Sequence, residues 1–371
     1  MNVPLLDLQA QYVSLRDSMR QAIERVLDSQ RFVLGDEVRE LENSIAEYCQ
    51  TKHAIGCASG SDALLLALMA LDIKEGDEVI TTPFSFFATG AAIARLGARP
   101  VFVDIDPRTY NLDVSRVPDA ITSRTKAIIP VHIYGQCAHM DALLYIGERC
   151  DIPIVEDAAQ AIGATDTERR AGSMGLMGCF SFYPTKNLGG AGDGGILTTN
   201  DERVAQRLRR LRTHGGANEY QHEEVGINSR LDELQAAVLR VKLPSLEKWS
   251  DERARKADRY SQLLSEADLT FPVVTPYVRP DGRHIFHQYV VRAPGNRDAL
   301  MDHLKHKGVG TKVYYPVPLH LQECFSYLGY KEGDFPEAES AARETFALPA
   351  YPELTDEQQV YVVEAFKSFR S

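Results

Sequence analysis

The sequence predicts an α/β fold in which a mostly parallel sheet lies between helices, followed by a smaller α+β region. Three observations indicate it. Short apolar runs alternate with helix-length segments between residues 50 and 200. Hydrophobic residues make up 44% of the 371 residues and charged residues 25%, which is typical of a globular chain with a sizeable core. After Gly226 the pattern changes to long helical segments, as expected where a second domain begins.

The predicted strands are near-continuous apolar runs, as expected where helices cover both faces of a sheet. They are Ala54–Cys57, Glu78–Thr82, Pro100–Ile105, Lys126–Ile133, Pro153–Glu156, Cys179–Phe182 and Ile196–Thr199. Helix-length segments lie between several of them, at Ala88–Leu96, Val117–Ile121 and Met140–Arg149. Strands that alternate with helices in this way predict a three-layer α/β/α arrangement.

A long kinked helix is predicted after Gly226. Residues Arg230–Leu243 are periodic, Pro244 interrupts them, and Ser245–Ala267 continues the helical pattern. A proline removes a backbone donor and clashes with the preceding turn, so we expect a kink there. We expect this helix to join a large domain at residues 1–243, which includes an N-terminal helical arm, to a small domain at residues 244–371.

The small domain is predicted to be α+β. Strands are expected at Phe286–Val291 and Thr311–Tyr315, and helices near residues 296–307 and 334–346. A last helix is predicted to begin at Thr355, because Thr355 and Gln358 have the spacing of a capping box.

The net charge of −11 disfavours nonspecific nucleic-acid binding, which needs a basic face. An anionic ligand must then be held by a local site. No apolar stretch is long enough for a membrane span, and no signal peptide is recognised. The 6 cysteines lack metal-ligand spacing. We expect a cytoplasmic protein with no nucleic-acid, membrane or metal partner, in which the HxxH pair His284 and His287 only packs a strand.

Two motifs lie where strands are expected to end. In Ala58–Leu64 a turn of small residues opens a helix, and its free amides fit a phosphate; a simple Ser or Asp N-cap is the alternative. In Ile154–Gln160 an acidic pair ends an apolar strand, where open α/β sheets bind ligands. A carboxylate there can hold a proton on a heterocyclic nitrogen, or it can cap a helix.

The strongest motif is Lys186, which follows a strand and precedes the glycine-rich run Gly189–Gly195. Glycines let the backbone approach a ligand closely, so an amine held against a bound ligand is favoured over a surface lysine. The run precedes a strand and not a helix, which disfavours a dinucleotide loop and a nicotinamide oxidoreductase.

Together with further motifs, this set resembles the nucleotide-sugar aminotransferases of the DegT/DnrJ/EryC1/StrS family. These enzymes use pyridoxal 5'-phosphate (PLP) and have the aspartate aminotransferase fold, PLP-dependent transferase fold type I. The resemblance covers nearly the whole chain. The further motifs are Arg31–Gly35, Thr82–Thr89, Pro130–Gly135, Gly226–Ala237 and Tyr314–His320.

The resemblance implies a role for each matching residue. It implies that Lys186 forms the Schiff base with PLP and moves the proton, and that Asp157 pairs with the ring nitrogen. The remaining implied cofactor contacts are Gln160 near the ring hydroxyl, Phe86 on the ring face, and Gly60, Ser61, Ser181 and, from the second subunit, Asn228 at the phosphate. The implied substrate contacts are Tyr183, Arg230, Tyr314 and His320. Active sites shared across a homodimer follow from the same resemblance.

The implied activity is transfer of the amino group of L-glutamate to a nucleoside-diphosphate-linked keto sugar. The C-terminal residues resemble members that act on 3-keto sugars, and a 4-keto substrate stays open, as does the nucleotide, dTDP or UDP. A PLP-type sugar dehydratase is disfavoured because Lys186 is present. A regulatory protein that binds PLP without turnover is the remaining alternative.

Overall fold

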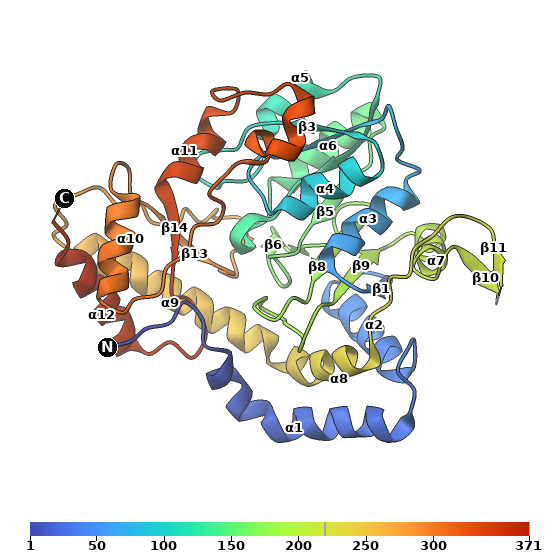
Figure 1. The fold of residues 1–371 in the computed structure, drawn as a ribbon, viewed down its shortest axis with the longest axis horizontal. Helices are drawn as coiled ribbons and strands as arrows, with labels where there is room; N and C mark the ends of the chain where they lie inside the picture. The colour runs from blue at the N-terminus through green and yellow to red at the C-terminus, as the bar shows by residue number, and fades with distance from the viewer. Residues whose placement is uncertain (219, 371) are drawn as a thin grey trace.

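A computed structural model of the chain describes residues 1–218 and 220–370 (Figure 1). Its centre is a sheet of seven strands: β1 (His53–Cys57), β2 (Glu78–Thr81), β3 (Arg99–Phe102), β4 (Thr125–Ile129), β5 (Val155–Asp157), β8 (Met177–Ser181) and β9 (Gly195–Thr199). Hydrogen bonds order them as β1-β9-β8-β5 and β3-β2-β4, and parallel bridges such as Ile128–Ile154 join β4 to β5. Only β9 runs antiparallel to its neighbours in this order. The mostly parallel sheet predicted from the sequence is confirmed.

Helices cover both faces of this sheet. One face packs against α3 (Gly60–Ala70), α4 (Phe87–Arg95) and α7 (Glu202–Leu211), in a core cluster that includes Leu66 and Leu197. On the other face, α2 (Asp36–Tyr48) and α8 (Glu233–Lys242) pack against the strands, and α6 (Met140–Cys150) covers the region of β2 and β4. Neighbouring strand residues such as Ala54 and Ile55 belong to opposite clusters, as the alternation of side chains in a strand requires.

The predicted kink after α8 is confirmed. A 3₁₀ turn, η3 (Leu243–Ser245), contains Pro244 and separates α8 from α9 (Leu246–Glu266). The N-terminal helix α1 (Leu8–Ser29) lies along α8 at the lower edge of Figure 1, where Ala22 and Val26 pack against Ala237. The division of the chain into domains at residue 243 stays a prediction.

The C-terminal region contains a two-stranded antiparallel sheet, β13 (Tyr289–Arg292) with β14 (Thr345–Leu348). It packs with α9, α10 (Arg297–His306) and α12 (Asp356–Lys367) around a core that includes Tyr260 and Phe366. The capping box predicted at Thr355 is present, with both of its hydrogen bonds.

Two predictions for this region were wrong. Residues 311–315 form no strand; Lys312 makes only a bridge to Ala347, and the following Pro316 has no amide to extend a ladder. The helix predicted at 334–346 ends earlier, because α11 (Pro336–Glu344) is followed directly by β14, whose four residues are fully buried.

The remaining elements are short. They are η1 (Val114–Arg116), α5 (Val117–Ala120), η2 (Ile133–Gly135), β6 (Thr165–Asp166), β7 (Arg169–Arg170), β10 (Gly216–Asn218), β11 (Gln221–His222), β12 (Gly282–Arg283), η4 (Leu319–Leu321) and η5 (Glu323–Leu328). Figure 1 shows the β10–β11 hairpin projecting from the body of the protein beyond α7. In residues 1–218 and 220–370, no helix has both the length and the hydropathy to cross a bilayer.

Candidate active site

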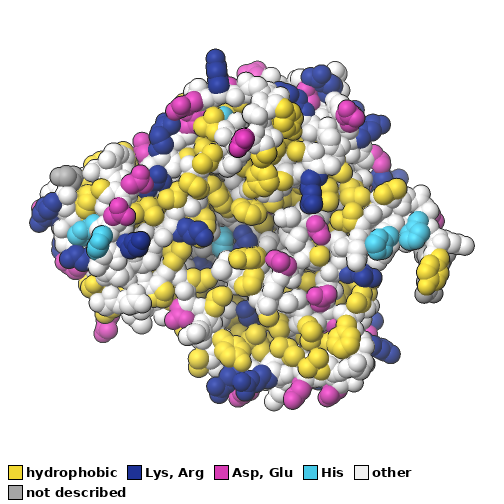
Figure 2. Space-filling model, in the orientation of Figure 1, with side chains coloured by type: hydrophobic (Ala, Val, Ile, Leu, Met, Phe, Trp, Pro, Cys, Tyr) yellow, Lys and Arg dark blue, Asp and Glu magenta, His cyan; other side chains and the backbone are white. Residues whose placement is uncertain are grey.

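A cavity of about 720 Å³ opens where β5 and β8 end and α3 begins. Figure 2 shows apolar side chains gathered around the centre of the face drawn there. The cavity wall combines distant parts of the chain, from Ser59–Ser61 to Lys312–Pro316. Of the residues predicted from the sequence, it brings together Gly60, Ser61, Phe86, Asp157, Gln160, Ser181, Tyr183, Lys186 and Tyr314.

Lys186 lies in the loop that follows β8. Its backbone amide donates to the carbonyl of Tyr183 at 2.8 Å, which closes a tight turn. A Cβ on Gly189 would lie 2.3 Å from the carbonyl oxygen of Pro184, so only glycine fits the next bend. Burial lowers the pKa of Lys186 to about 8, against the opposing charge of Asp157. Roughly a tenth of the amine is therefore neutral at pH 7, far more than for an ordinary lysine.

Asp157 is the last residue of β5, and its side chain is buried. Its Oδ2 accepts a hydrogen bond from the Thr89 hydroxyl at 2.7 Å, and its Oδ1 accepts the amide of Ala159 at 3.2 Å. Burial raises the pKa of Asp157, and the hydrogen bond from Thr89 is the largest opposing effect. Asp157 is thus a buried carboxyl group whose ionised form a cationic partner would favour.

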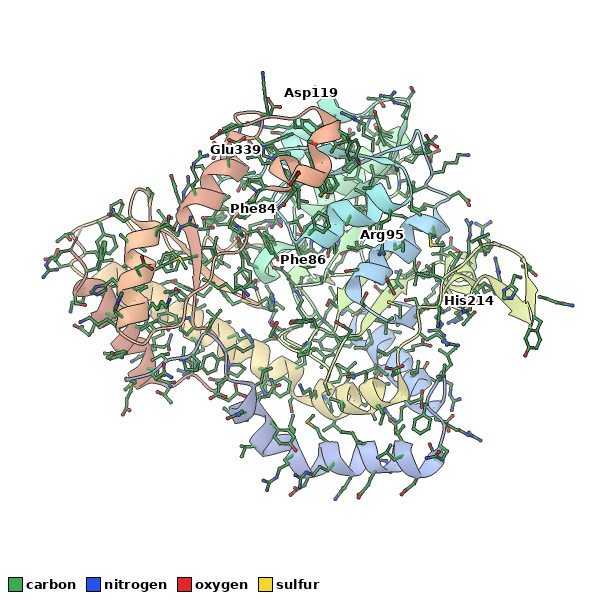
Figure 3. The ribbon with its side chains drawn as sticks, viewed as in Figure 1. Phe84, Phe86, Arg95, Asp119, His214 and Glu339 are labelled. Atoms are coloured by element: carbon green, nitrogen blue, oxygen red, sulfur yellow. The ribbon has the colours of Figure 1, made fainter. Side chains whose placement is uncertain are left out.

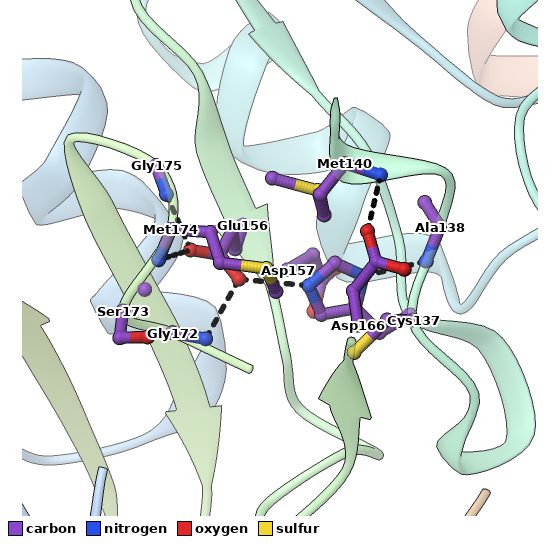
Figure 4. Close-up of polar contacts among 12 residues, drawn as sticks. Cys137, Ala138, Met140, Glu156, Asp157, Asp166, Gly172, Ser173, Met174 and Gly175 are labelled. Atoms are coloured by element: carbon purple, nitrogen blue, oxygen red, sulfur yellow. Dashed lines mark hydrogen bonds and ion pairs between the residues drawn. The ribbon is translucent and has the colours of Figure 1, made fainter. Parts of the chain in front are cut away.

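The preceding residue, Glu156, points away from the cavity, as side chains alternate along a strand. Figure 4 shows its two oxygens accepting hydrogen bonds from the amides of Gly172, Met174 and Gly175 at 2.6–2.8 Å. His132 Nε2 contacts the same carboxylate at 2.9 Å. The acidic pair is therefore divided: Asp157 faces the cavity, and Glu156 fixes the loop behind it.

The helix α3 begins at the cavity. Ser59 caps it, since its hydroxyl accepts the amide of Asp62 at 3.1 Å. The N-cap interpretation and the phosphate interpretation are compatible, because the amides of Gly60 and Ser61 have no acceptor within the helix. A Cβ on Gly60 would lie 2.6 Å from the Cβ of Ser181, so these two residues form one close-packed corner.

Gln160 and a tyrosine that sequence reasoning missed form a second polar corner. Gln160 Oε1 accepts the amide of Tyr134 at 2.8 Å, and its Nε2 donates to the hydroxyl of Tyr315 at 2.8 Å. The ring of Tyr315 lies 6.1 Å from that of Phe86, which caps α4 and is exposed. The motif Tyr314–His320 contained Tyr315, but no spacing rule distinguished it from Tyr314.

Two predicted residues line a neighbouring hollow instead. Asn228 and Arg230 border a space of about 500 Å³ that shares Ser59 and Asp193 with the cavity. Their place beside the cavity, and not inside it, is compatible with the prediction that Asn228 contacts the phosphate bound by a second subunit, and Arg230 stays a predicted diphosphate contact.

His320 does not reach the cavity. Its ring is buried, lies 4.7 Å from the ring of Phe335, and contacts Glu339 at 3.1 Å through Nε2. Figure 3 places Glu339 on α11, apart from Phe86 at the start of α4. The structure therefore does not bring His320 to the predicted sugar pocket, because the 319–339 segment folds it inward.

Three further residues at or behind the cavity wall were missed. Thr89 stands in the motif Thr82–Thr89 and donates a hydrogen bond to Asp157 from behind the wall; its helical spacing from Ser85 was the available signal. His287 lines the cavity, with Nδ1 3.1 Å from Asn187 Oδ1, and burial lowers its pKa well below the usual range. Lys312 lines it too.

His284 does pack as predicted, stacked 3.8 Å from the ring of Phe286.

A comparison with protein-family models matches residues 13–367 to the DegT/DnrJ/EryC1/StrS aminotransferase family. The chain belongs to this family. The match leaves only the ends of the chain outside, so the cavity and all its walls fall within the aminotransferase family match.

Named relatives of this aminotransferase cover essentially its whole length. A protein from Geobacillus stearothermophilus named pleiotropic regulatory protein is 53% identical over 100% of this chain and 99% of its own. The dTDP-3-amino-3,4,6-trideoxy-alpha-D-glucose transaminase of Streptomyces venezuelae is 45% identical, over 99% of this chain and 96% of its own. The UDP-N-acetyl-3-dehydro-alpha-D-glucosamine 3-aminotransferase of Acidithiobacillus ferrooxidans is 43% identical, over 96% and 95%.

Solved structures share the fold of this aminotransferase. DesV from S. venezuelae, in complex with a ketimine intermediate, superposes with a TM-score of 0.95 at 44% identity, covering 99% of this chain and 98% of DesV. The protein ntda from Bacillus subtilis, with bound cofactor PMP, gives a TM-score of 0.89 at 30% identity, covering 98% and 82%. The predicted fold type is confirmed.

Proposed function

We propose that this chain is a PLP-dependent aminotransferase that moves the amino group of L-glutamate to a nucleoside-diphosphate-linked 3-keto sugar and so makes an amino sugar. The proposal rests on one observation: an amine, a buried carboxylate and the start of a helix all line the same cavity. The amine belongs to Lys186, the carboxylate to Asp157, and the helix is α3.

These three features fit the three reactive parts of PLP. An aldehyde needs an amine that is partly neutral, which Lys186 supplies. A ring nitrogen that carries a proton needs an anion, which Asp157 supplies, and a phosphate needs amide donors, which the first turn of α3 supplies. The close contact of Gly60 with Ser181 brings two of the predicted phosphate-binding residues together. When bound, PLP acts as an electron sink that carries the amino group between donor and acceptor.

The protein's own residues would then divide the work. Lys186 has a pKa lowered to about 8, so it can take a proton from one carbon and return it to another. Asp157 holds the charge of the ring nitrogen. Gln160 and Phe86 orient the ring from its edge and its face, and Gly60, Ser61, Ser181 and the second subunit's Asn228 hold the phosphate.

The substrate class follows two of the relatives named above, the transaminases whose names give dTDP- and UDP-linked sugars aminated at C3. In this chain Tyr183 and Tyr314 line the cavity where the sugar would bind, and Arg230 offers a guanidinium to a diphosphate. A 4-keto sugar is the alternative acceptor.

We also propose a homodimer with shared sites. The neighbouring hollow holds Asn228, which the family resemblance assigns to the phosphate of the second subunit, so in the proposed dimer Asn228 of each chain would complete the cavity of the other. Subunit mixing tests this. If Lys186→Ala and Asn228→Asp chains are each inactive, random dimers should regain roughly a quarter of the wild-type activity, because one site in each mixed dimer is intact. No recovery on mixing would show that each chain holds a complete site.

The name of the Geobacillus relative favours a second candidate, a regulatory protein that binds PLP without turnover. The decisive experiment loads the purified protein with PLP and follows its visible absorbance while L-glutamate is added. An aminotransferase bleaches the absorbance and releases 2-oxoglutarate, and Lys186→Ala does neither. Colour that no amino donor changes supports the regulator, and a protein that takes up no PLP contradicts both candidates.

For the acceptor, the loaded protein is then assayed with dTDP- and UDP-linked 3-keto and 4-keto sugars. Turnover confined to the 4-keto sugars would overturn the choice of carbon.

A further inference from the structure

Two hydroxyl groups connect the cavity wall to Asp157. We propose that Ser85 and Thr89 are positioning residues that hold the Asp157 side chain in its ionised form through a chain of two hydrogen bonds. The inference rests on the proposed function, because it assigns Asp157 to the ring nitrogen of PLP.

The two hydrogen bonds are short, and the three side chains that form them are buried. Ser85 Oγ lies 2.8 Å from Thr89 Oγ1, and Thr89 Oγ1 lies 2.7 Å from Asp157 Oδ2. Thr89 is 0% exposed, Ser85 3% and Asp157 5%. Ser85 precedes α4 and Thr89 lies in its first turn, so the start of this helix places both hydroxyls against the end of β5. In a site with so little water, each of these hydrogen bonds counts strongly.

The direction of the protons follows from the groups present. An ionised carboxylate only accepts, so the single hydrogen of the Thr89 hydroxyl goes to Asp157. The oxygen of Thr89 is then free to accept, and Ser85 donates to it. If Asp157 takes up a proton, the chain reverses: Asp157 donates to Thr89, and Thr89 donates to Ser85. Among the described residues, Thr89 is the one side-chain donor to Asp157. The hydroxyl chain therefore directly affects the equilibrium between the ionised and the protonated form of Asp157.

Other groups face Asp157 from the surrounding elements. Lys186 after β8 and His132 after β4 favour its charge, while burial opposes it. Cys179 on β8 and Tyr315 face it as well, and their own ionisation is disfavoured by burial and by the charge of Asp157. None of these four donates a hydrogen bond to Asp157 in the described structure. The hydroxyl chain is therefore the feature whose removal changes the ionisation of Asp157 with least change in shape.

The substitution Thr89→Val keeps the shape of the side chain and removes the donor. A hydrogen bond to a charged group is strong enough that its loss should weaken PLP binding roughly tenfold or more. Ser85→Ala should have a smaller effect in the same direction, since Thr89 can still donate. Thr89→Ser should restore binding because it restores the hydroxyl.

A matched control removes a similar hydroxyl elsewhere. Thr81 is also 0% exposed, and its hydroxyl donates to the carbonyl of Ile129 at 2.8 Å. Thr81→Val therefore loses a buried hydrogen bond without touching Asp157. It should leave PLP binding unchanged.

The test uses PLP labelled with ¹⁵N in the ring, bound to the full-length protein. The nitrogen chemical shift separates a protonated ring from a neutral one. We expect a protonated ring in the wild type and in the Thr81→Val and Thr89→Ser variants, and a shift toward the neutral ring in Thr89→Val. Affinity is measured in parallel by equilibrium dialysis with PLP and with 1-deazapyridoxal 5'-phosphate, which lacks the nitrogen.

The two cofactors make the outcomes distinct. The Thr89→Val variant should bind PLP more weakly than the wild type does, and it should bind the deaza analogue with the wild-type affinity. Equal nitrogen chemical shifts in the wild type and in Thr89→Val would overturn the inference. An equal loss of affinity for PLP and for the deaza analogue would overturn it too, because it would indicate a general disturbance of the cavity. Failure of the wild type to take up PLP would instead contradict the proposed function.

Discussion

Glu156 offers a strong test of how the site is supported. The substitution Glu156→Gln changes one buried oxygen into an NH₂ group, with almost no change in volume. In the wild type one oxygen accepts hydrogen bonds from the amides of Met174 and Gly175 (Figure 4). The other oxygen accepts hydrogen bonds from the amide of Gly172 and from the ring of His132. His132 donates through Nε2, since its Nδ1 accepts the amide of Ala138 at 3.1 Å. Four donors therefore converge on one side chain.

Whichever oxygen is replaced, two of these donors then face another donor. A buried donor without a partner costs about 1–3 kcal/mol, so the two together should lower the free energy of unfolding by roughly 2–6 kcal/mol. The measurement is equilibrium unfolding in urea, followed by circular dichroism on the cofactor-free protein. Glu148 is an exposed residue of α6, and Glu148→Gln should change the free energy of unfolding by less than about 0.5 kcal/mol. A loss below about 1 kcal/mol in Glu156→Gln would refute this account of Glu156.

Three further substitutions or conditions test the cavity. Gly60→Ala places a Cβ 2.6 Å from that of Ser181, so we expect PLP binding by dialysis to weaken and stability to fall by about 1–3 kcal/mol; wild-type binding would contradict the close corner. Because only a neutral amine attacks an aldehyde, covalent attachment of added PLP at Lys186 should accelerate with rising pH and level off above about 8; a midpoint near the ordinary lysine pKa would disprove the shift. Lys312 lines the cavity, so Lys312→Met should raise the KM for glutamate several-fold, whereas the exposed Lys305→Met should leave it unchanged.

Much of the fold was predictable because its signals are local. The apolar runs of the parallel sheet and the capping box at Thr355 depend on neighbouring residues, and both are present. The strand β14 was missed because its four residues follow a helical pattern without a break, and only pairing with β13 makes them extended. The predicted strand at 311–315 failed because its pairing with β14 stops at the single bridge Lys312–Ala347, and residues 312–316 line the cavity instead.

The site shows the same division. Asp157 ends β5 and Lys186 lies in the loop after β8, so their positions follow from the chain order. Thr89 matters only because α4 begins beside β5, which no local pattern records. His320 belongs to a motif near the cavity, but the packing of Phe335 and Glu339 draws its ring inward. Sequence reasoning therefore located Lys186 and Asp157 at the cavity better than the residues that surround them.

The cavity wall extends in sequence from Ser59 to Pro316. During synthesis, the ribosome must release the greater part of the polypeptide before these segments can meet, and contacts this distant in sequence form late. A nascent chain halted between residues 186 and 312 would contain Lys186 but not the wall segment Lys312–Pro316. We therefore expect PLP to bind only after most of the chain has been synthesised, when folding is nearly complete.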